Sequence, residues 1–254
     1  MPTLNVVDEG SGTPVVLLHG LTATHRYGVM GSKSLERSGH RVVAYDARGH
    51  GASAPAEPYD YETLTADLEQ ILDDRGIESA VLAGASMGAH TLLRFAIERP
   101  ERVRALVVIT PSYDPVAFPG DLERWDALAD GLERGGVDGF IEAYGPVTGR
   151  WADTVARVLR QRLALHDHPE ALAQALRQVP RSRPFKDLHA IAGIEVPVTI
   201  VASRDEADPG HPLSVGQEYA RLIPGARLLV EEEGSSPIAW QGGQLSKVIA
   251  EAAV

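Results

Sequence analysis

One short stretch, residues 80–97, constrains this chain more than any other. An apolar run from Ala80 to Ala83 leads into Gly84-Ala85-Ser86-Met87-Gly88, and a helical pattern follows directly. In a strand, sharp turn and helix of this kind the central residue is strained, so its neighbours must be small for strand and helix to approach. The pattern predicts that the Ser86 hydroxyl lies above the end of a strand, with the backbone N–H of Met87 directed at the same point. The alternative is an ordinary turn of small residues.

The composition narrows the class of protein. The chain has 254 residues, of which 44% are hydrophobic, enough for one large α/β domain or two small ones. It has no cysteine, which excludes disulfides and thiol chemistry. Its net charge of -11 and the absence of a basic run argue against nucleic acid and anionic membranes as partners. The N-terminal residues do not resemble a signal peptide, and no apolar run approaches the ~18 residues of a membrane span. We therefore expect a soluble cytoplasmic protein, a monomer or a homodimer, that acts on a small molecule.

Strand and helix patterns alternate through most of the chain. This rhythm is typical of a doubly wound, mostly parallel sheet with helices on both faces. Apolar runs predict strands at residues 4–7, 15–18, 41–45, 80–83, 103–109, 197–202 and 226–230. Helical patterns predict helices at residues 27–38, 61–75, 213–223 and within 238–253, besides the helix after Ser86.

The rhythm stops between residues 111 and 190. No strand-like run occurs there, and helical patterns cover residues 122–133, 137–144, 151–165 and 170–178. We expect a helical cap or lid at 111–190, inserted in a core formed by residues 1–110 and 191–254. A helical layer without a role in substrate binding is the alternative. The aromatic residues of this segment could line a pocket, although helical spacing more often marks core residues: Tyr113, Phe118, Trp125, Phe140, Tyr144 and Trp151.

Two further loops follow predicted strands. His19-Gly20-Leu21 ends the buried strand at 15–18, and its glycine would let the loop pass close to Ser86. The N–H of Leu21 could then be a second hydrogen-bond donor to an oxyanion. The loop from Asp46 to Gly51 is charged and punctuated by glycines. Its residues are expected to brace one another rather than to react.

Taken together, Leu18-His19-Gly20, residues 45–51 and Gly84–Gly88 give the chain a clear resemblance to the α/β-hydrolase fold superfamily, of the serine esterase and lipase type. The resemblance spans essentially the whole chain and implies a sheet of the eight-stranded type. It implies Ser86 as the nucleophile and the N–H groups of Leu21 and Met87 as the oxyanion hole. It also implies an acid after the strand at 197–202, for which Asp205 is favoured over Asp208; Asp205 could instead be only a turn residue.

The chain departs from the family pattern at one point. After the last strand the family has roughly Gly-His-x-Pro, with the histidine as general base, whereas this chain has Gly234-Ser235-Ser236-Pro237. Ser235 thus occupies the position of the expected base, and serine cannot accept a proton near neutral pH as an imidazole can. His211 and His25 are candidates for a relocated base. His90, on the first turn of the helix after Ser86, is expected to pack or to face solvent.

These residues predict a hydrolase that cleaves a carboxylic ester or related acyl bond. A serine at position 86 argues against dehalogenation and epoxide opening, which use a carboxylate nucleophile on this scaffold. Serine-based acyl transfer needs no metal or organic cofactor, and none is expected. Three explanations of the missing histidine stay open: a relocated base, a weak or inactive hydrolase that binds a small molecule, and a base-deleted variant of an active esterase.

Overall fold

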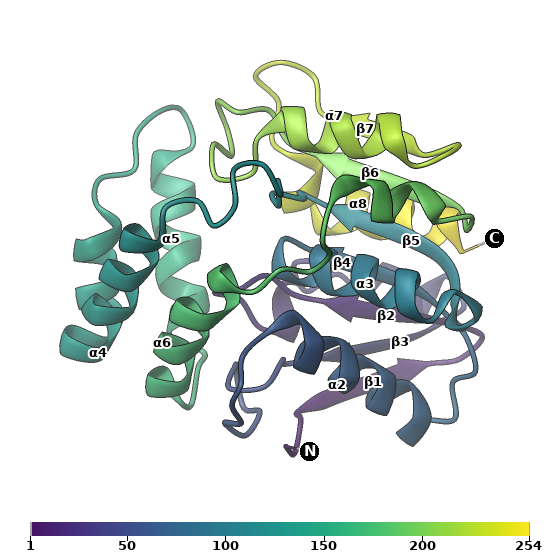
Figure 1. Ribbon diagram of the computed structural model, residues 1–254, viewed down its shortest axis with the longest axis horizontal. Helices are drawn as coiled ribbons and strands as arrows, with labels where there is room; N and C mark the ends of the chain where they lie inside the picture. Colours follow the sequence, from purple (N-terminus) through teal and green to yellow (C-terminus); the bar gives the residue numbers. More distant parts are fainter. Residues whose placement is uncertain (1, 254) are drawn as a thin grey trace.

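A seven-stranded sheet forms the centre of the molecule. The computed structural model describes residues 2–253. The strand order is β1-β3-β2-β4-β5-β6-β7, with β1 antiparallel to β3 and all other neighbours parallel (Figure 1). The expected mostly parallel sheet is therefore confirmed, with seven strands among the described residues rather than eight. The strands are β1 (Val6–Gly10), β2 (Thr13–Leu18), β3 (His40–Tyr45), β4 (Ala80–Ala85), β5 (Val103–Ile109), β6 (Val198–Ala202) and β7 (Arg227–Val230).

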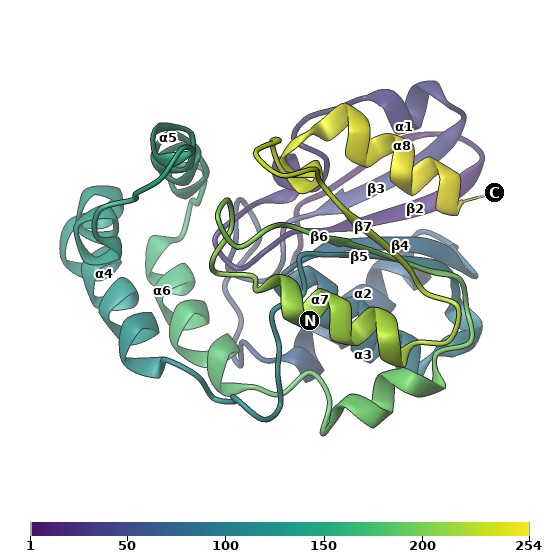
Figure 2. The ribbon, with the colours of Figure 1, turned by 90° about the horizontal axis from the view of Figure 1, so that it is seen from above.

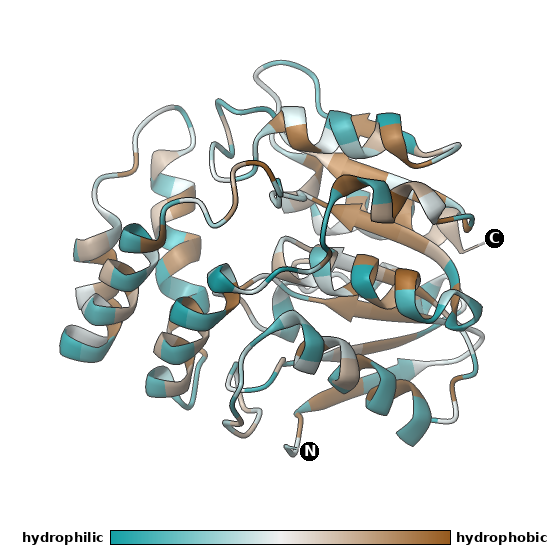
Figure 3. Cartoon of the chain, viewed as in Figure 1, coloured by the Kyte–Doolittle hydropathy of each residue, from teal (hydrophilic) through white to brown (hydrophobic). Residues whose placement is uncertain are grey.

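Helices cover both faces of this sheet, which is why its central strands are apolar along almost their whole length. On one face lie α1 (Ser34–Arg37) and α8 (Gly242–Ala252). On the other lie α2 (Tyr61–Asp74), α3 (Met87–Glu98) and α7 (Leu213–Leu222), as Figure 2 shows. Figure 3 shows the consequence: the strands are hydrophobic, whereas the helices around them are of mixed polarity.

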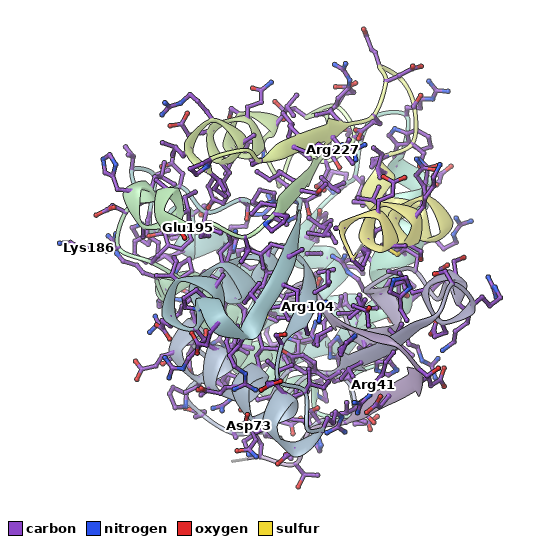
Figure 4. The ribbon with its side chains drawn as sticks, turned by 90° about the vertical axis from the view of Figure 1, so that its right-hand side faces the viewer. Arg41, Asp73, Arg104, Lys186, Glu195 and Arg227 are labelled. Carbon is purple, nitrogen blue, oxygen red and sulfur yellow. The ribbon has the colours of Figure 1, made fainter. Side chains whose placement is uncertain are left out.

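The amino ends of the parallel strands meet at one edge of the sheet, which Figure 4 faces. Arg41, Arg104 and Arg227 lie near the starts of β3, β5 and β7. Arg41 pairs with Asp8 at 2.7 Å, and Arg227 with Glu251 at 3.3 Å. Because ligands of such sheets bind at the opposite, carboxyl ends of the strands, the loops that follow the strands are the place to look for a site.

Residues 111–190 hold three long helices and no strand. They are α4 (Leu122–Tyr144), α5 (Ala152–Leu163) and α6 (Pro169–Gln178), with short 3-10 turns at Val179–Arg181 and Leu188–Gly193. Gly135 and Gly136 break the helical backbone of α4, so it consists of two helices meeting at a kink, as the sequence predicts. An apolar cluster joins these helices to the sheet side: Leu21, Tyr61 and Met87 pack with Leu128, Leu132, Phe140, Leu159, Leu163, Leu172 and Leu176.

The helix predicted at residues 27–38 is largely wrong. The structure has only a 3-10 turn at His25–Tyr27 and the short α1 there. Met30 and Gly31 have φ of +49° and +73°, a region that a helix cannot use. Val29 is buried against the sheet from an irregular loop, and Leu35 from the single turn of α1. Within residues 2–253 no helix combines the length and the apolar character that crossing a membrane requires.

Candidate active site

Ser86 stands at the turn between β4 and α3. Its φ and ψ are 51° and -112°, a conformation that non-glycine residues rarely adopt. A Cβ atom on Gly84 would lie 2.6 Å from the backbone of Gly88, and one on Gly88 would lie 2.5 Å from the carbonyl oxygen of Leu18. Only glycine fits at both positions, so the sharp turn predicted from the sequence is what these residues form.

The Ser86 side chain lines a cavity at the carboxyl ends of the strands. No hydrogen bond joins its hydroxyl to any residue of the 2–253 range. The cavity has a volume of about 710 Å³ including its open mouth. Both the sheet side and residues 111–190 line it: Leu21, Tyr61, Ser86, Met87 and His90 from the first, and Ser112, Tyr113, Phe118, Trp125, Val179 and Ser182 from the second.

The loop after β2 places a second backbone donor at this cavity. The Leu21 N–H has no acceptor among the described residues. His19 Nδ1 donates to the carbonyl oxygen of Gly20 (2.8 Å), while its Nε2 accepts from the N–H of Ala47 (2.9 Å). Because the N–H and C=O of a trans peptide point in opposite directions, fixing the Gly20 oxygen turns the Leu21 N–H away from His19. Burial lowers the pKa of His19 to about 3, which keeps it neutral in this role.

Met87 supplies the first donor because it begins α3. The first N–H groups of a helix have no partner within it, and they carry the positive end of the helix dipole. Leu21, Ser86 and Met87 all line the one cavity. The structure thus brings together the three residues that the sequence predicts to hold an oxyanion beside a hydroxyl.

The charged loop after β3 is a bracing network. The Asp46 carboxylate accepts hydrogen bonds from the backbone N–H and Nδ1 of His25 (2.7 and 2.8 Å) and from Asn5 (2.8 Å). Burial opposes ionisation of Asp46, but these bonds outweigh it and hold the pKa well below its usual range. Arg48 forms a buried two-pronged pair with Asp67, at 2.7 Å for both bonds. His25 is therefore committed to Asp46 as a structural partner.

His90 lines the cavity, a position that the sequence did not indicate. Its Nε2 accepts from the N–H groups of Ser112 and Tyr113 (both 3.1 Å), so its Nδ1 carries the proton and donates to the Tyr61 hydroxyl (3.1 Å). Burial and the nearby charge of His211 lower the pKa of His90 to about 3. An imidazole with both nitrogens occupied and so low a pKa cannot act as a general base near neutral pH.

The two candidate acids in the loop after β6, Asp205 and Asp208, have different hydrogen-bond partners. Asp205 is exposed and accepts a hydrogen bond from the N–H of Leu213 (2.7 Å), the first residue of α7. Asp208 instead pairs with His211, whose Nδ1 lies 2.9 Å from both carboxylate oxygens. The acid–imidazole pair that exists in this loop thus uses Asp208, whereas the resemblance favours Asp205.

Ser235 is exposed in the loop after β7. Its backbone N–H donates to the carbonyl oxygen of Glu232 (3.0 Å), and Gly234 beside it has φ +72°. The segment 111–190 reaches this loop, since a Cβ atom on Gly234 would lie 3.1 Å from the Arg150 guanidinium. Among residues 2–253, no histidine is hydrogen-bonded to the Ser86 hydroxyl.

Of the aromatic residues predicted for the pocket, half line it. Tyr113, Phe118 and Trp125 face the cavity. Phe140 is buried and stacks on Tyr144 at 6.2 Å between ring centroids. The third, Trp151, packs edge-on against Trp240.

Within the described residues, no group of three or more His, Asp or Glu side chains is arranged to hold a metal ion.

Several known proteins are similar to this chain. It is 26% identical to the AB hydrolase superfamily protein YisY of Bacillus subtilis over 240 residues, which cover 87% of the chain and 86% of that protein. It is 36% identical to the sn-1-specific diacylglycerol lipase ABHD11 of Mus musculus over 107 residues, covering 41% of the chain and 35% of that protein. The chain thus matches less than half the length of some relatives.

Solved structures of other proteins have a similar fold. It superposes on a thermophilic esterase from Thermogutta terrifontis with a TM-score of 0.81 at 24% identity, covering 98% of this chain and 92% of the other. A family model described as the alpha/beta hydrolase fold matches residues 13–242. The strained serine turn, the parallel sheet and this match over most of the sequence lead to one conclusion: the chain belongs to the α/β-hydrolase fold family.

Proposed function

We propose that this protein is a serine hydrolase of carboxylesterase type, which cleaves small carboxylic esters. One observation carries the proposal: the unbonded hydroxyl of Ser86 shares a cavity with two backbone donors, the N–H groups of Leu21 and Met87. That arrangement suits a reaction in which negative charge develops on a carbonyl oxygen beside the attacked carbon. The hydrolases among the relatives support the reaction class.

The reaction would begin with attack of Ser86 Oγ on the ester carbonyl carbon, as the serine proton passes to a base. The carbonyl oxygen becomes an oxyanion and accepts hydrogen bonds from the Leu21 and Met87 N–H groups. Collapse of this intermediate expels the alcohol and leaves an acyl-serine, which water then hydrolyses to the acid. Preorganised donors of this kind contribute on the order of 10²–10³ in rate each.

The simplest test of the nucleophile is the substitution Ser86→Ala. Hydrolysis of p-nitrophenyl acetate should fall to the background rate while the melting temperature stays close to that of the wild type. Ser11→Ala, which removes an exposed hydroxyl at the other end of the sheet, serves as the control and should leave the rate unchanged. Activity that survives Ser86→Ala would rule out Ser86 as the nucleophile.

The general base has two candidate positions, which a pair of variants separates. If position 235 is vacant, Ser235→His should raise the rate on activated esters, since general-base catalysis typically contributes roughly 10²–10⁴-fold. If the Asp208–His211 pair has taken over the role, His211→Ala should abolish activity and Ser235→His should add little. Asp205 would hold the start of α7 in both cases. In the Ser235→His protein it would also orient the new imidazole.

A small-molecule binder without turnover is the second candidate, because no imidazole is hydrogen-bonded to Ser86 among residues 2–253. Calorimetry with an ester and rapid-quench detection of acyl-serine distinguish the two. Saturable binding without any acyl-serine, unaltered by Ser235→His and by His211→Ala, would favour the binder.

We also propose that residues 111–190 form a cap on a core made of residues 1–110 and 191–254. The support is that Trp125, Val179 and Ser182 line the cavity that contains Ser86. A cap that opens for substrate should exchange its amide hydrogens faster than strands β4 and β5 do. Equal protection of both would contradict a moving cap.

A further inference from the structure

His166, shortly after α5, joins the segment 111–190 to two loops of the core. The long helices of that segment, α4, α5 and α6, stand together to one side of the sheet (Figures 1 and 2). His166 Nδ1 accepts a hydrogen bond from the N–H of Gly51, in the loop after β3 (3.0 Å). Its Nε2 lies 3.3 Å from the carbonyl oxygen of Thr22, in the loop after β2. The backbone strengthens the same junction, because the Asp167 N–H donates to the Gly51 oxygen (2.9 Å).

The hydrogen bond from Gly51 decides which nitrogen of His166 carries the proton. A backbone N–H can only donate, so Nδ1 must be the bare nitrogen and Nε2 the protonated one in a neutral ring. Burial lowers the pKa of His166 to about 4, which keeps the ring neutral near pH 7. His166 Nε2 therefore donates its hydrogen to the Thr22 carbonyl oxygen.

Two peptide groups continue this hydrogen bond towards the cavity. The carbonyl of Thr22 belongs to the peptide whose N–H is that of Ala23, and this N–H donates to the carbonyl oxygen of Gly20 (2.9 Å). The carbonyl of Gly20 belongs in turn to the peptide whose N–H is that of Leu21. Because the C=O and N–H of a trans peptide point in opposite directions, every donor of the chain faces the same way. The last one, the Leu21 N–H, has no acceptor in the described protein and Leu21 lines the cavity.

Such a chain acts on its last donor in two ways. Each hydrogen bond polarises the peptide that accepts it and strengthens the next bond, by about 10–30% per link. The bond to Thr22 also fixes the plane of its peptide, and through Ala23 the plane of the peptide that carries the Leu21 N–H. His19 holds the Gly20 oxygen as well, at 2.8 Å. Loss of the His166 bond should therefore weaken the Leu21 donor without releasing it.

We propose that His166 is a positioning residue for the oxyanion, which directs and strengthens the Leu21 N–H through Thr22 and Ala23. This rests on the proposed esterase function. His166 is not among the described residues that line the cavity, so it acts only through the loop after β2. The effect belongs to the steps in which the carbonyl oxygen is negative, and should appear in kcat rather than in KM.

The kinetic test uses two side chains of different reach. Asn at position 166 retains a hydrogen-bond acceptor where Nδ1 stands, but is too short to donate to Thr22. His166→Asn should lower kcat on p-nitrophenyl acetate by about 3- to 10-fold, less than the 10²–10³-fold cost of deleting an oxyanion donor, and change KM by less than about twofold. Gln is longer by one methylene and carries an amide donor to the place of Nε2. His166→Gln should restore kcat to within about twofold of the wild type.

His168→Asn is the matched control. His168 lies two residues further along the same segment, and among residues 2–253 its ring forms no hydrogen bond. The substitution should leave kcat unchanged. If His166 only fastens the segment to the core, His166→Asn keeps the bond from Gly51 and has the wild-type kcat. That result, or an equal loss of kcat in His166→Gln and His166→Asn, would show the proposal to be wrong.

An inhibitor that carries the oxyanion tests the same point at equilibrium. The Ser86 oxygen adds to the carbonyl carbon of 1,1,1-trifluorooctan-2-one, the serine proton leaves to the base, and the ketone oxygen becomes negative. His166→Asn should raise the inhibition constant of this ketone by the factor by which it lowers kcat/KM. Octan-2-one, which forms no stable adduct, should bind both proteins equally. Equal losses of affinity for the two ketones would contradict a role at the oxyanion.

Hydrogen exchange measures the chain itself, without turnover. In the Ser86→Ala background, His166→Asn should speed exchange of the Ala23 amide by about fivefold or more, because the bond to Gly20 is weakened, and His168→Asn should not. An unchanged rate at Ala23 would overturn the proposal. Faster exchange at Ala23 together with no hydrolysis by the wild type would instead overturn the esterase function and leave the chain of hydrogen bonds standing.

Discussion

Two polar groups without a protein partner line one cavity at the carboxyl edge of the sheet: the Ser86 hydroxyl and the Leu21 N–H. Native proteins pair nearly all of their enclosed polar groups, so partnerless ones gathered in one region indicate a place kept for a ligand. The histidines around them do the opposite, since His19 and His90 use both ring nitrogens within the protein. Hydrogen bonding thus separates the polar groups that we propose to take part in the reaction from those that hold the fold.

His19 should be a positioning residue for the oxyanion donor. His19→Ala removes one of the two hydrogen bonds to the Gly20 oxygen and leaves the one from the Ala23 N–H (2.9 Å), so the direction of the Leu21 N–H is held less firmly. We expect kcat on p-nitrophenyl acetate to fall by about 10-fold or more, towards the loss seen when a donor is deleted, with KM little changed. His19→Asn keeps a donor near Nδ1 and should recover part of the rate. His189→Ala, at an exposed histidine, is the control. A wild-type kcat in His19→Ala would contradict this role.

At the scale of elements, the β4–α3 turn depends on close backbone contact. Gly88→Ala would place a Cβ atom 2.5 Å from the Leu18 carbonyl oxygen, an atom of β2 that cannot move without disturbing the sheet. Overpacking of this kind destabilises proteins by roughly 1–3 kcal/mol, and we expect urea unfolding to show a loss of at least that size. Gly243→Ala in α8 meets open space, and should be neutral or stabilise by about 0.5–1 kcal/mol. Equal effects of the two substitutions would refute the packing argument.

Most elements could be predicted from the sequence because their hydrophobic pattern and their packing agree. The strand at Val103–Ile109 has the predicted bounds, since it is apolar at nearly every position and buried on both faces. The kink of α4 is visible in the sequence as Gly135-Gly136. The helix predicted at 27–38 failed because Met30 and Gly31 have positive φ, so only the single turn of α1 at Ser34–Arg37 is helical after them.

The site was only partly predictable for a physical reason. Ser86, Leu21 and Met87 follow from local chain geometry, which a short motif encodes. The pairing of His211 with Asp208, three residues earlier, depends on the conformation of one loop, which no short motif encodes. Residues such as His90 and Tyr61, 29 positions apart, reach the cavity together only through the packing of α2 beside α3.

At the scale of the whole molecule, enclosed imidazoles link stability to pH: those of His19, His90 and His166, and that of His50, whose pKa burial also lowers. Burial lowers the pKa values of His19 and His90 to about 3 and that of His166 to about 4, from 6.5 in an exposed histidine. The unfolded chain therefore binds more protons than the folded protein below pH 6.5. Their contribution to stability is complete above pH 6.5 and is lost as the pH falls towards the folded-state values.

The free energy of unfolding should consequently decrease steeply in acid. His19, His90 and His166 each contribute a slope of about 1.4 kcal/mol per pH unit between their two pKa values, together about 4 kcal/mol per unit below pH 6, and His50 adds to this slope. Urea titrations at pH 7.5, 6.5 and 5.5 measure this, with little change between the first two. His166→Asn should make the acid slope shallower by about 1.4 kcal/mol per pH unit, because one of these imidazoles is gone. The same substitution at the exposed His189 should not alter it. An unchanged free energy of unfolding between pH 6.5 and 5.5 would contradict this prediction. It would mean that these histidines can be protonated at no cost in the folded protein, and that their hydrogen bonds to Gly20 and Gly51 do not stabilise it.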